Sequence, residues 1–203
     1  MLQSISTCLL FACLTCLMGP PLAAQNDWQE GHVVTMQGDT LRGLVRDRDT
    51  GPFGGMFGKV QVKEGGKGRA RKFAPRKVRS YQWGDAQFVT LYTESESEFF
   101  KTRTYVTEGR GEPGFYRVIA AGELTLYHDE FTDEDNFRID FVPVFKREGN
   151  PQLVRATQGI LGLKKKLLSE FFADRPALVA QIKNGQLTTP LEVWEAYEKG
   201  TAQ

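Results

Sequence analysis

Short runs of alternating hydrophobic and polar residues occupy most of the chain between residues 31 and 157. Such alternation is typical of strands that bury one face. Turn-forming sequences separate pairs of these runs, which predicts hairpins around residues 38–39, 65–68 and 121–122. We expect further strands over 86–93 and 136–145. The second should end near Pro143 at a sheet edge, because proline cannot donate to a central ladder.

After about residue 157 the hydrophobic period changes to that of a helix. Apolar residues between Ile160 and Phe171 mark one helical face. A second short helix is expected from Asp174, with Pro176 in its first turn, and a third follows a capping box at residues 189–192. The fold class predicted is α+β: a mainly antiparallel sheet or roll of short hairpins, followed by three short C-terminal helices packed on it.

The first 24 residues carry no charged side chain and have the order of a secretion signal. An apolar run over 8–18 precedes a Gly-Pro-Pro break and small residues, so we expect cleavage after Ala24. The run is too short for a comfortable transmembrane helix, although an uncut anchor and a lipoprotein acylated at Cys13 are alternatives. The predicted organisation is a signal peptide over 1–24, a β-rich region over 25–157 and a helical region over 158–203 in the same domain.

Composition narrows the chemistry that this chain can perform. All three cysteines lie in the predicted signal, so the processed chain would have no disulfide, thiol nucleophile or cysteine-zinc site. His32 and His128 are the only histidines, both are expected in strands, and no serine stands in a nucleophile-elbow motif. We predict no catalytic residue, no metal ligand and no cofactor, and a carboxylate-only hydrolase is the remaining enzymatic alternative.

Charge is near zero overall but uneven. The 26 Lys and Arg balance 25 Asp and Glu, which argues against a dedicated nucleic-acid binder. Basic side chains nevertheless crowd residues 59–79, with Tyr81 and Trp83 nearby for stacking. The candidate binding residues of this stretch are Lys59, Lys63, Lys67, Arg69, Arg71, Lys72, Arg76, Lys77, Arg79, Tyr81 and Trp83. They could bind a polyanion such as lipopolysaccharide head groups or extracellular DNA, or simply keep an exposed hairpin soluble.

Three other segments have two interpretations each. The glycine-rich stretch 51–58 fails as a phosphate loop, and its aromatics either contact a partner or fold onto the core. The acidic stretch 129–136 lacks the spacing of a calcium loop and is interpreted as a solvated turn. Residues Lys164–Lys166 could attach the helical region to a membrane surface, but its apolar side is expected to dock on the sheet.

Three segments together resemble an exported family common in Bacteroidota that has no assigned activity. They are GHVVTMQGDTLRGLV from residue 31, KFAPRKVRSYQW from residue 72, and FYRVIAAGELTLYHD from residue 115 with the later LLSEFFADRPALVAQIKNG. The resemblance implies export to the cell envelope and carries over no catalytic residue. The chain departs from the family at Arg76-Lys77, where an acidic or polar pair is expected, and by the stretch 51–58.

These observations favour an exported envelope protein, periplasmic or associated with the outer membrane or cell surface. We expect a non-enzymatic interaction or structural module whose contact surface lies within residues 51–79 and whose partner is another envelope protein. A polyanion-binding module using residues 59–79 is the alternative, with no nucleic acid expected in normal function. No transmembrane span is expected after signal cleavage.

Overall fold

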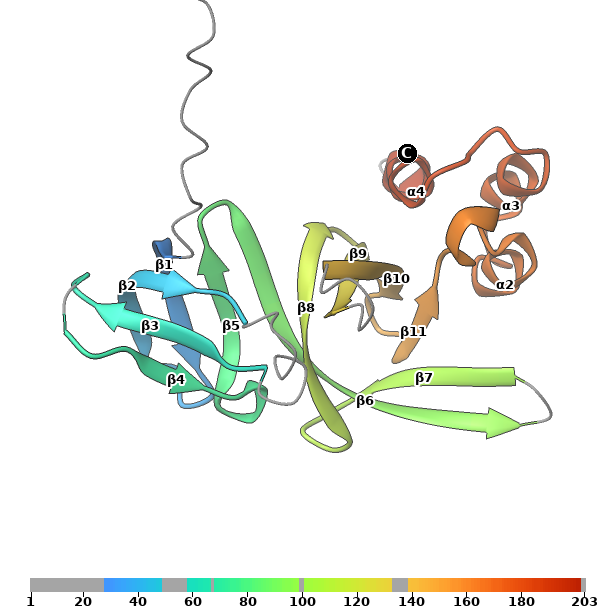
Figure 1. Ribbon diagram of the computed structural model, residues 1–203. Helices are drawn as coiled ribbons and strands as arrows, with labels where there is room; N and C mark the ends of the chain where they lie inside the picture. The colour runs from blue at the N-terminus through green and yellow to red at the C-terminus, as the bar shows by residue number, and fades with distance from the viewer. Residues whose placement is uncertain (1–27, 49–57, 67, 99–100, 133–138, 202–203) are drawn as a thin grey trace, which may run out of the picture.

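A computed structural model describes residues 28–48, 58–66, 68–98, 101–132 and 139–201. The predicted signal and most of the stretch 51–58 lie outside these residues. Within these ranges, eleven strands form one continuous antiparallel sheet in the order β4-β3-β2-β1-β5-β6-β7-β11-β10-β9-β8, and β6 also pairs with β8. This last pairing closes β6 to β11 into a six-stranded barrel, with β1 to β5 attached to it through β6 (Figure 1).

The N-terminal sheet consists of β1 (Trp28–Thr35), β2 (Thr40–Arg46), β3 (Val60–Glu64), β4 (Arg71–Phe73) and β5 (Val78–Trp83), with a 3-10 turn η1 (Pro75–Lys77) before β5. The hairpins predicted around residues 38–39 and 65–68 are confirmed as β1-β2 and β3-β4. One face of this sheet encloses a core with Val33, Val45, Val62, Tyr81 and, from the barrel, Phe88 and Phe115. The barrel's outer face therefore completes the N-terminal core.

The barrel strands are β6 (Ala86–Glu98), β7 (Lys101–Thr107), β8 (Glu112–Ala120), β9 (Leu124–Thr132), β10 (Ile139–Arg147) and β11 (Gln152–Arg155). The hairpin predicted around residues 121–122 is β8-β9. The expectation that a strand ends at Pro143 is wrong, because β10 continues to Arg147. Proline is tolerated there since β10 pairs with β11 only from Val144 onward.

Three helices cover one side of the barrel: α2 (Lys165–Phe171), α3 (Pro176–Lys183) and α4 (Pro190–Thr201) (Figure 1). Their apolar faces, expected to dock on the sheet, join Leu124, Leu126 and Phe145 in a second core. Trp194 Nε1 donates to the Leu124 carbonyl at 2.7 Å, which fixes α4 against β9. The α+β class and the three closing helices are confirmed, and the closed barrel is more specific than the predicted roll of hairpins.

The first helix begins later than the hydrophobic period predicted. Residues Gly159–Leu161 form a 3-10 turn, η2, and Leu163 forms an isolated bridge with Thr157, so the helix starts only at Lys165. The reason is local: Gly159 and Gly162 adopt positive φ angles of 66° and 77°, which a continuous α-helix excludes. The capping box of α4 is confirmed, because Glu192 N donates to Thr189 Oγ1 at 3.2 Å and Thr189 N donates back to Glu192 Oε2 at 3.0 Å.

Candidate binding surface

The face of the N-terminal sheet opposite its core carries a row of polar and aromatic side chains. Directly paired residues lie on the same face, and the registers link Lys72 of β4 to Gln61 of β3, Gln61 to Arg46 of β2, and Arg46 to Trp28 of β1. The alternation of the strands turns valines toward the core and these residues to the opposite face, where Gln61 is covered by its neighbours and only 6% exposed. Four segments distant in sequence thus contribute to one surface.

Two cations of this face are held against the indole of Trp28. Arg46 Cζ lies 5.4 Å from the ring centroid and Lys63 Nζ lies 4.2 Å from it. Gln61, with its amide oxygen turned toward Arg46, accepts from Nη2 at 2.6 Å and from Nε at 3.2 Å. Cation–π contact of this kind contributes roughly 0.5–1 kcal/mol at an exposed site. These contacts favour the orientation in which both charges lie against Trp28.

A shallow groove of about 640 Å³ crosses the same face. Its lining includes Arg42 and His32, which are paired in register, and Glu30. Gly31 of β1 and Gly43 of β2 are paired in register and both line the groove. A Cβ on Gly31 would lie 2.0 Å from the carbonyl oxygen of Gln82 on β5, the other neighbour of β1. The close approach of β1 and β5 therefore requires glycine at position 31, and the backbone itself shapes this part of the groove.

The residues expected to bind a ligand do not all lie on one surface of the structure. Lys63 and Lys72 lie on the outer face, whereas Arg71 pairs with Val62 and so belongs to the opposite side. The basic residues of this hairpin therefore do not form a band on a single face. Lys67 lies outside the described residues, and the remaining basic side chains of the stretch are exposed, namely Lys59, Arg69, Arg76, Lys77 and Arg79.

The aromatic residues expected to stack on a ligand point elsewhere. Tyr81 is only 1% exposed and stacks on Phe88 with ring centroids 4.5 Å apart, so it cannot receive a base or sugar. Trp83 is half-buried and packs against the N-terminal core. Trp28, Arg42 and Arg46 were not among the predicted residues. The sequence signal for them is the period-two spacing in WQEGH and LRGLVR, which places Trp28 with His32, and Arg42 with Arg46, on one face of their respective strands.

A buried ionic cluster joins this sheet to the barrel. Arg48, just beyond β2, donates from Nη2 to Glu130 Oε2 at 2.8 Å and from Nε to Asp47 Oδ1 at 3.2 Å. Its Nη1 lies 3.4 Å from the Phe115 carbonyl, and the Tyr81 hydroxyl donates to Asp47 Oδ1. The guanidinium also lies over the Phe88 and Phe115 rings. Arg48 thus occupies the seam between the two parts of the fold.

Burial dominates the protonation chemistry of this cluster. Desolvation raises the pKa of Tyr81 well above its usual value, although the Arg48 charge opposes it. Desolvation also raises the pKa of Glu130, again against the nearby Arg48 charge. For Arg48 itself, burial favours the neutral form, but Tyr81, Asp47 and Glu130 outweigh it and the pKa rises. The cluster is therefore a paired, charged structural contact.

The histidine beside an acid on β9 does not form a catalytic pair. His128 pairs with Arg117 on the outer barrel face, whereas Asp129 pairs with Tyr116 on the opposite face. Burial and the Arg117 charge lower the pKa of His128 to about 4, and its ring stacks on Phe141 at 3.9 Å. Burial raises the pKa of Asp129. The two side chains point away from each other, as expected for neighbours in a strand.

The acidic stretch 129–136 is in part a strand, which corrects its interpretation as a solvated turn. β9 continues to Thr132, and Glu130 contacts Arg48, with only 8% of its side chain exposed. Residues 133–138 lie outside the described residues. Hydrophobic alternation stops after Tyr127, where His128, Asp129 and Glu130 are polar on both faces, so the sequence pattern gave no signal for the end of this strand.

Within the described ranges, no three His, Cys, Asp or Glu side chains gather as a metal site would require. Among the same residues, no helix combines the length and apolar character needed to cross a bilayer. No family model, curated protein or solved structure matches this chain. The resemblance to an exported Bacteroidota family therefore stays a prediction.

Proposed function

We propose that the protein is an exported, non-enzymatic module of the cell envelope that binds an acidic protein partner on the outer face of its N-terminal sheet. The observation that carries this proposal is the pair of cations fixed against Trp28, with Arg42 and Lys72 on the same face. Arginine and tryptophan are enriched where protein interfaces concentrate their binding energy. Cations held in place beforehand lose less side-chain entropy on binding.

Local charge supports an acidic partner. The described residues from 28 to 83 contain eleven Lys and Arg but four Asp and Glu. One of these acids, Asp47, already contacts Arg48, and another, Glu64, pairs with Arg71. A surface with this imbalance attracts acidic partners and speeds their association.

The first test is a mild-detergent pull-down of the processed protein from cell envelopes, read by mass spectrometry. The double variant Arg42→Glu, Lys63→Glu reverses two charges of the face. Its matched control is Arg110→Glu, Lys199→Glu, which makes the same change in net charge at exposed sites elsewhere. We expect a near-stoichiometric acidic protein with the wild type and the control, and its loss with the face variant. Equal capture by all three proteins would refute the proposal.

A polyanion is the second candidate for the same cations. Arg76 and Lys77 on η1 and Arg79 on β5 are also exposed. They add further positive charge to the N-terminal sheet beyond its outer face. Binding of heparin or lipopolysaccharide would then weaken steeply with salt, because each neutralised phosphate or sulfate releases counterions. Capture of a polyanion without a protein, with such a salt dependence, would favour this second function over the first.

A further inference from the structure

A short closed loop between β11 and α2 holds an apolar side chain out in solvent. Its base is the bridge between Thr157 and Leu163, and Gln158 N donates to the Gly162 carbonyl at 2.9 Å. Leu161, at the tip, is 73% exposed, while Leu163 two residues later is buried. The hydrogen bonds and the glycines that flank the tip fix this conformation, so the exposure of Leu161 is built into the backbone.

Cations surround the base of this loop. Arg155 is exposed and its Nε donates to the Thr157 carbonyl at 3.0 Å. On the other side, Lys164 is half-buried, and Lys165 and Lys166 are exposed in the first turn of α2. The apolar tip is therefore flanked on both sides by long basic side chains, a combination that the hydrophobic period alone did not show.

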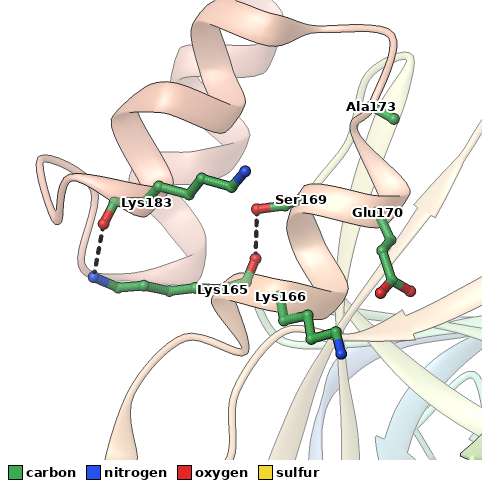
Figure 2. A pocket seen from close by; sticks show the side chains of 6 residues that line it. All are labelled: Lys165, Lys166, Ser169, Glu170, Ala173 and Lys183. Carbon is green, nitrogen blue, oxygen red and sulfur yellow. Dashed lines mark hydrogen bonds between the residues drawn. The ribbon is translucent and has the colours of Figure 1, made fainter.

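The same cations extend into a hollow between α2 and α3 of about 560 Å³ (Figure 2). Lys165 reaches across it and donates to the Lys183 carbonyl at 3.3 Å, and Lys166 and Lys183 also line it. Figure 2 shows the Lys183 side chain extending from α3 toward Ser169 on α2. Glu170 is the acid among the lining residues, so three ammonium groups outnumber one carboxylate.

We propose that this loop and the adjoining lysines attach the protein peripherally to an anionic phospholipid surface. Leu161 would enter the boundary between headgroups and acyl chains, and the basic side chains would lie among the phosphates. A protein interface normally centres on a packed apolar patch with aromatic residues, whereas here one leucine projects among cations. Charge complementarity and the projecting shape both favour a bilayer surface as the occupant.

The expected strength of membrane binding follows from its electrostatic and its hydrophobic contributions. Each basic residue near an anionic surface strengthens partitioning about fivefold, and burial of a leucine by a further tenfold or so. The sum suits reversible attachment rather than permanent insertion. This surface belongs to the helical side of the molecule, whereas the N-terminal sheet lies at the other end (Figure 1). The proposal therefore stands independently of the acidic partner.

The test is co-sedimentation of the processed protein with vesicles of equal parts phosphatidylglycerol and phosphatidylcholine. We expect binding to these vesicles and much weaker binding to phosphatidylcholine alone. Leu161→Asn should lower partitioning about tenfold, while Phe131→Asn, at another exposed apolar site, should leave it unchanged. Lys165→Glu, Lys166→Glu should lower it more than tenfold and remove most of its salt dependence.

The double variant Arg110→Glu, Lys199→Glu is the control for net charge. Circular dichroism and thermal melting of every variant separate a binding defect from a failure to fold. Absence of wild-type binding to the anionic vesicles would overturn the proposal, as would equal binding to phosphatidylcholine alone. It would also fail if Arg42→Glu, Lys63→Glu abolished vesicle binding while the loop variants bound normally, because the N-terminal face would then be the membrane contact.

Discussion

Replacement of Arg48 by methionine tests whether the buried cluster holds the N-terminal sheet on the barrel. Methionine keeps an unbranched apolar chain against Phe88 and Phe115 but removes the charge. Asp47 then loses its cation, and Glu130 keeps only Arg117, whose Nη1 lies 3.6 Å from Oε1, where little water reaches either acid. Removing one partner of a buried ion pair typically costs about 3–5 kcal/mol. We expect Arg48→Met to lower the free energy of unfolding by about that amount at pH 7.

Lowering the pH should restore part of the stability of this variant. Glu130 already has a raised pKa from burial, and loss of the Arg48 charge that opposes this raises it further. A carboxyl with a raised pKa in the folded state holds its proton longer than in the unfolded state. Stability therefore falls as pH rises through the window between the two pKa values, and recovers as pH falls back through it. The recovery should be larger in Arg48→Met than in wild type.

Urea unfolding followed by fluorescence, at pH 7 and at lower pH, measures both effects. Glu130→Gln added to Arg48→Met removes the unpaired charge and should regain a substantial part of the loss, as a double-mutant cycle would show. Arg110→Met, at an exposed turn, is the control and should change stability by less than about 0.5 kcal/mol. A loss below about 1 kcal/mol for Arg48→Met, or one that does not change with pH, would refute the reasoning.

Four further predictions concern local features. Gly31→Ala should destabilise the fold by about 1–3 kcal/mol in thermal or urea unfolding, because its Cβ meets the carbonyl of β5. Gly58→Ala should be near neutral, because its Cβ would make only an ordinary contact with Arg48 Cδ at 4.0 Å. An NMR titration should give His128 a pKa of about 4. Because the unfolded chain takes up this proton near the ordinary pKa of 6.5, the stability of the fold decreases as the pH drops from 6.5 toward 4. A titration near 6.5 would contradict the burial argument. Thr189→Ala should cost about 0.5–2 kcal/mol through loss of the cap. Hydrogen bonds from the residues that precede α4 lower the pKa of Glu192. The stability that its carboxylate contributes is therefore lost as the pH falls through this lowered pKa. Glu192→Gln should remove this acid dependence.

Local signals in the sequence predicted the local elements. The turn around residues 38–39 and the capping box of α4 each depend on residues close together in the chain, and both are confirmed. Barrel closure joins Gln87 to Val118 and Thr93 to Glu112, and such distant pairing leaves no short-range pattern. The helix expected from Ile160 was wrong because hydrophobic spacing outweighed the glycines that interrupt it.

The same limit explains the binding surface. The basic stretch 59–79 is evident in the sequence, but its members divide between two faces of the sheet, and the nearby Tyr81 and Trp83 both pack in the N-terminal core. The cations that share a face come instead from different strands. Arg46 and Lys63 meet at Trp28 only because β1, β2 and β3 pair in that register. Periodicity assigned each residue to a face of its own strand and could not choose among strand orders.

Net charge also has a different meaning once the fold is known. A total of +1 argued against a dedicated nucleic-acid binder. Yet dissolved salt screens the interaction between charges over roughly 8 Å at physiological ionic strength, which is far less than the separation of opposite ends of this molecule. Figure 1 shows the N-terminal sheet and the C-terminal helices on opposite sides of the barrel. The acidic residues of the barrel strands therefore balance the count without neutralising either end, and a nearly neutral chain presents two separate cationic surfaces.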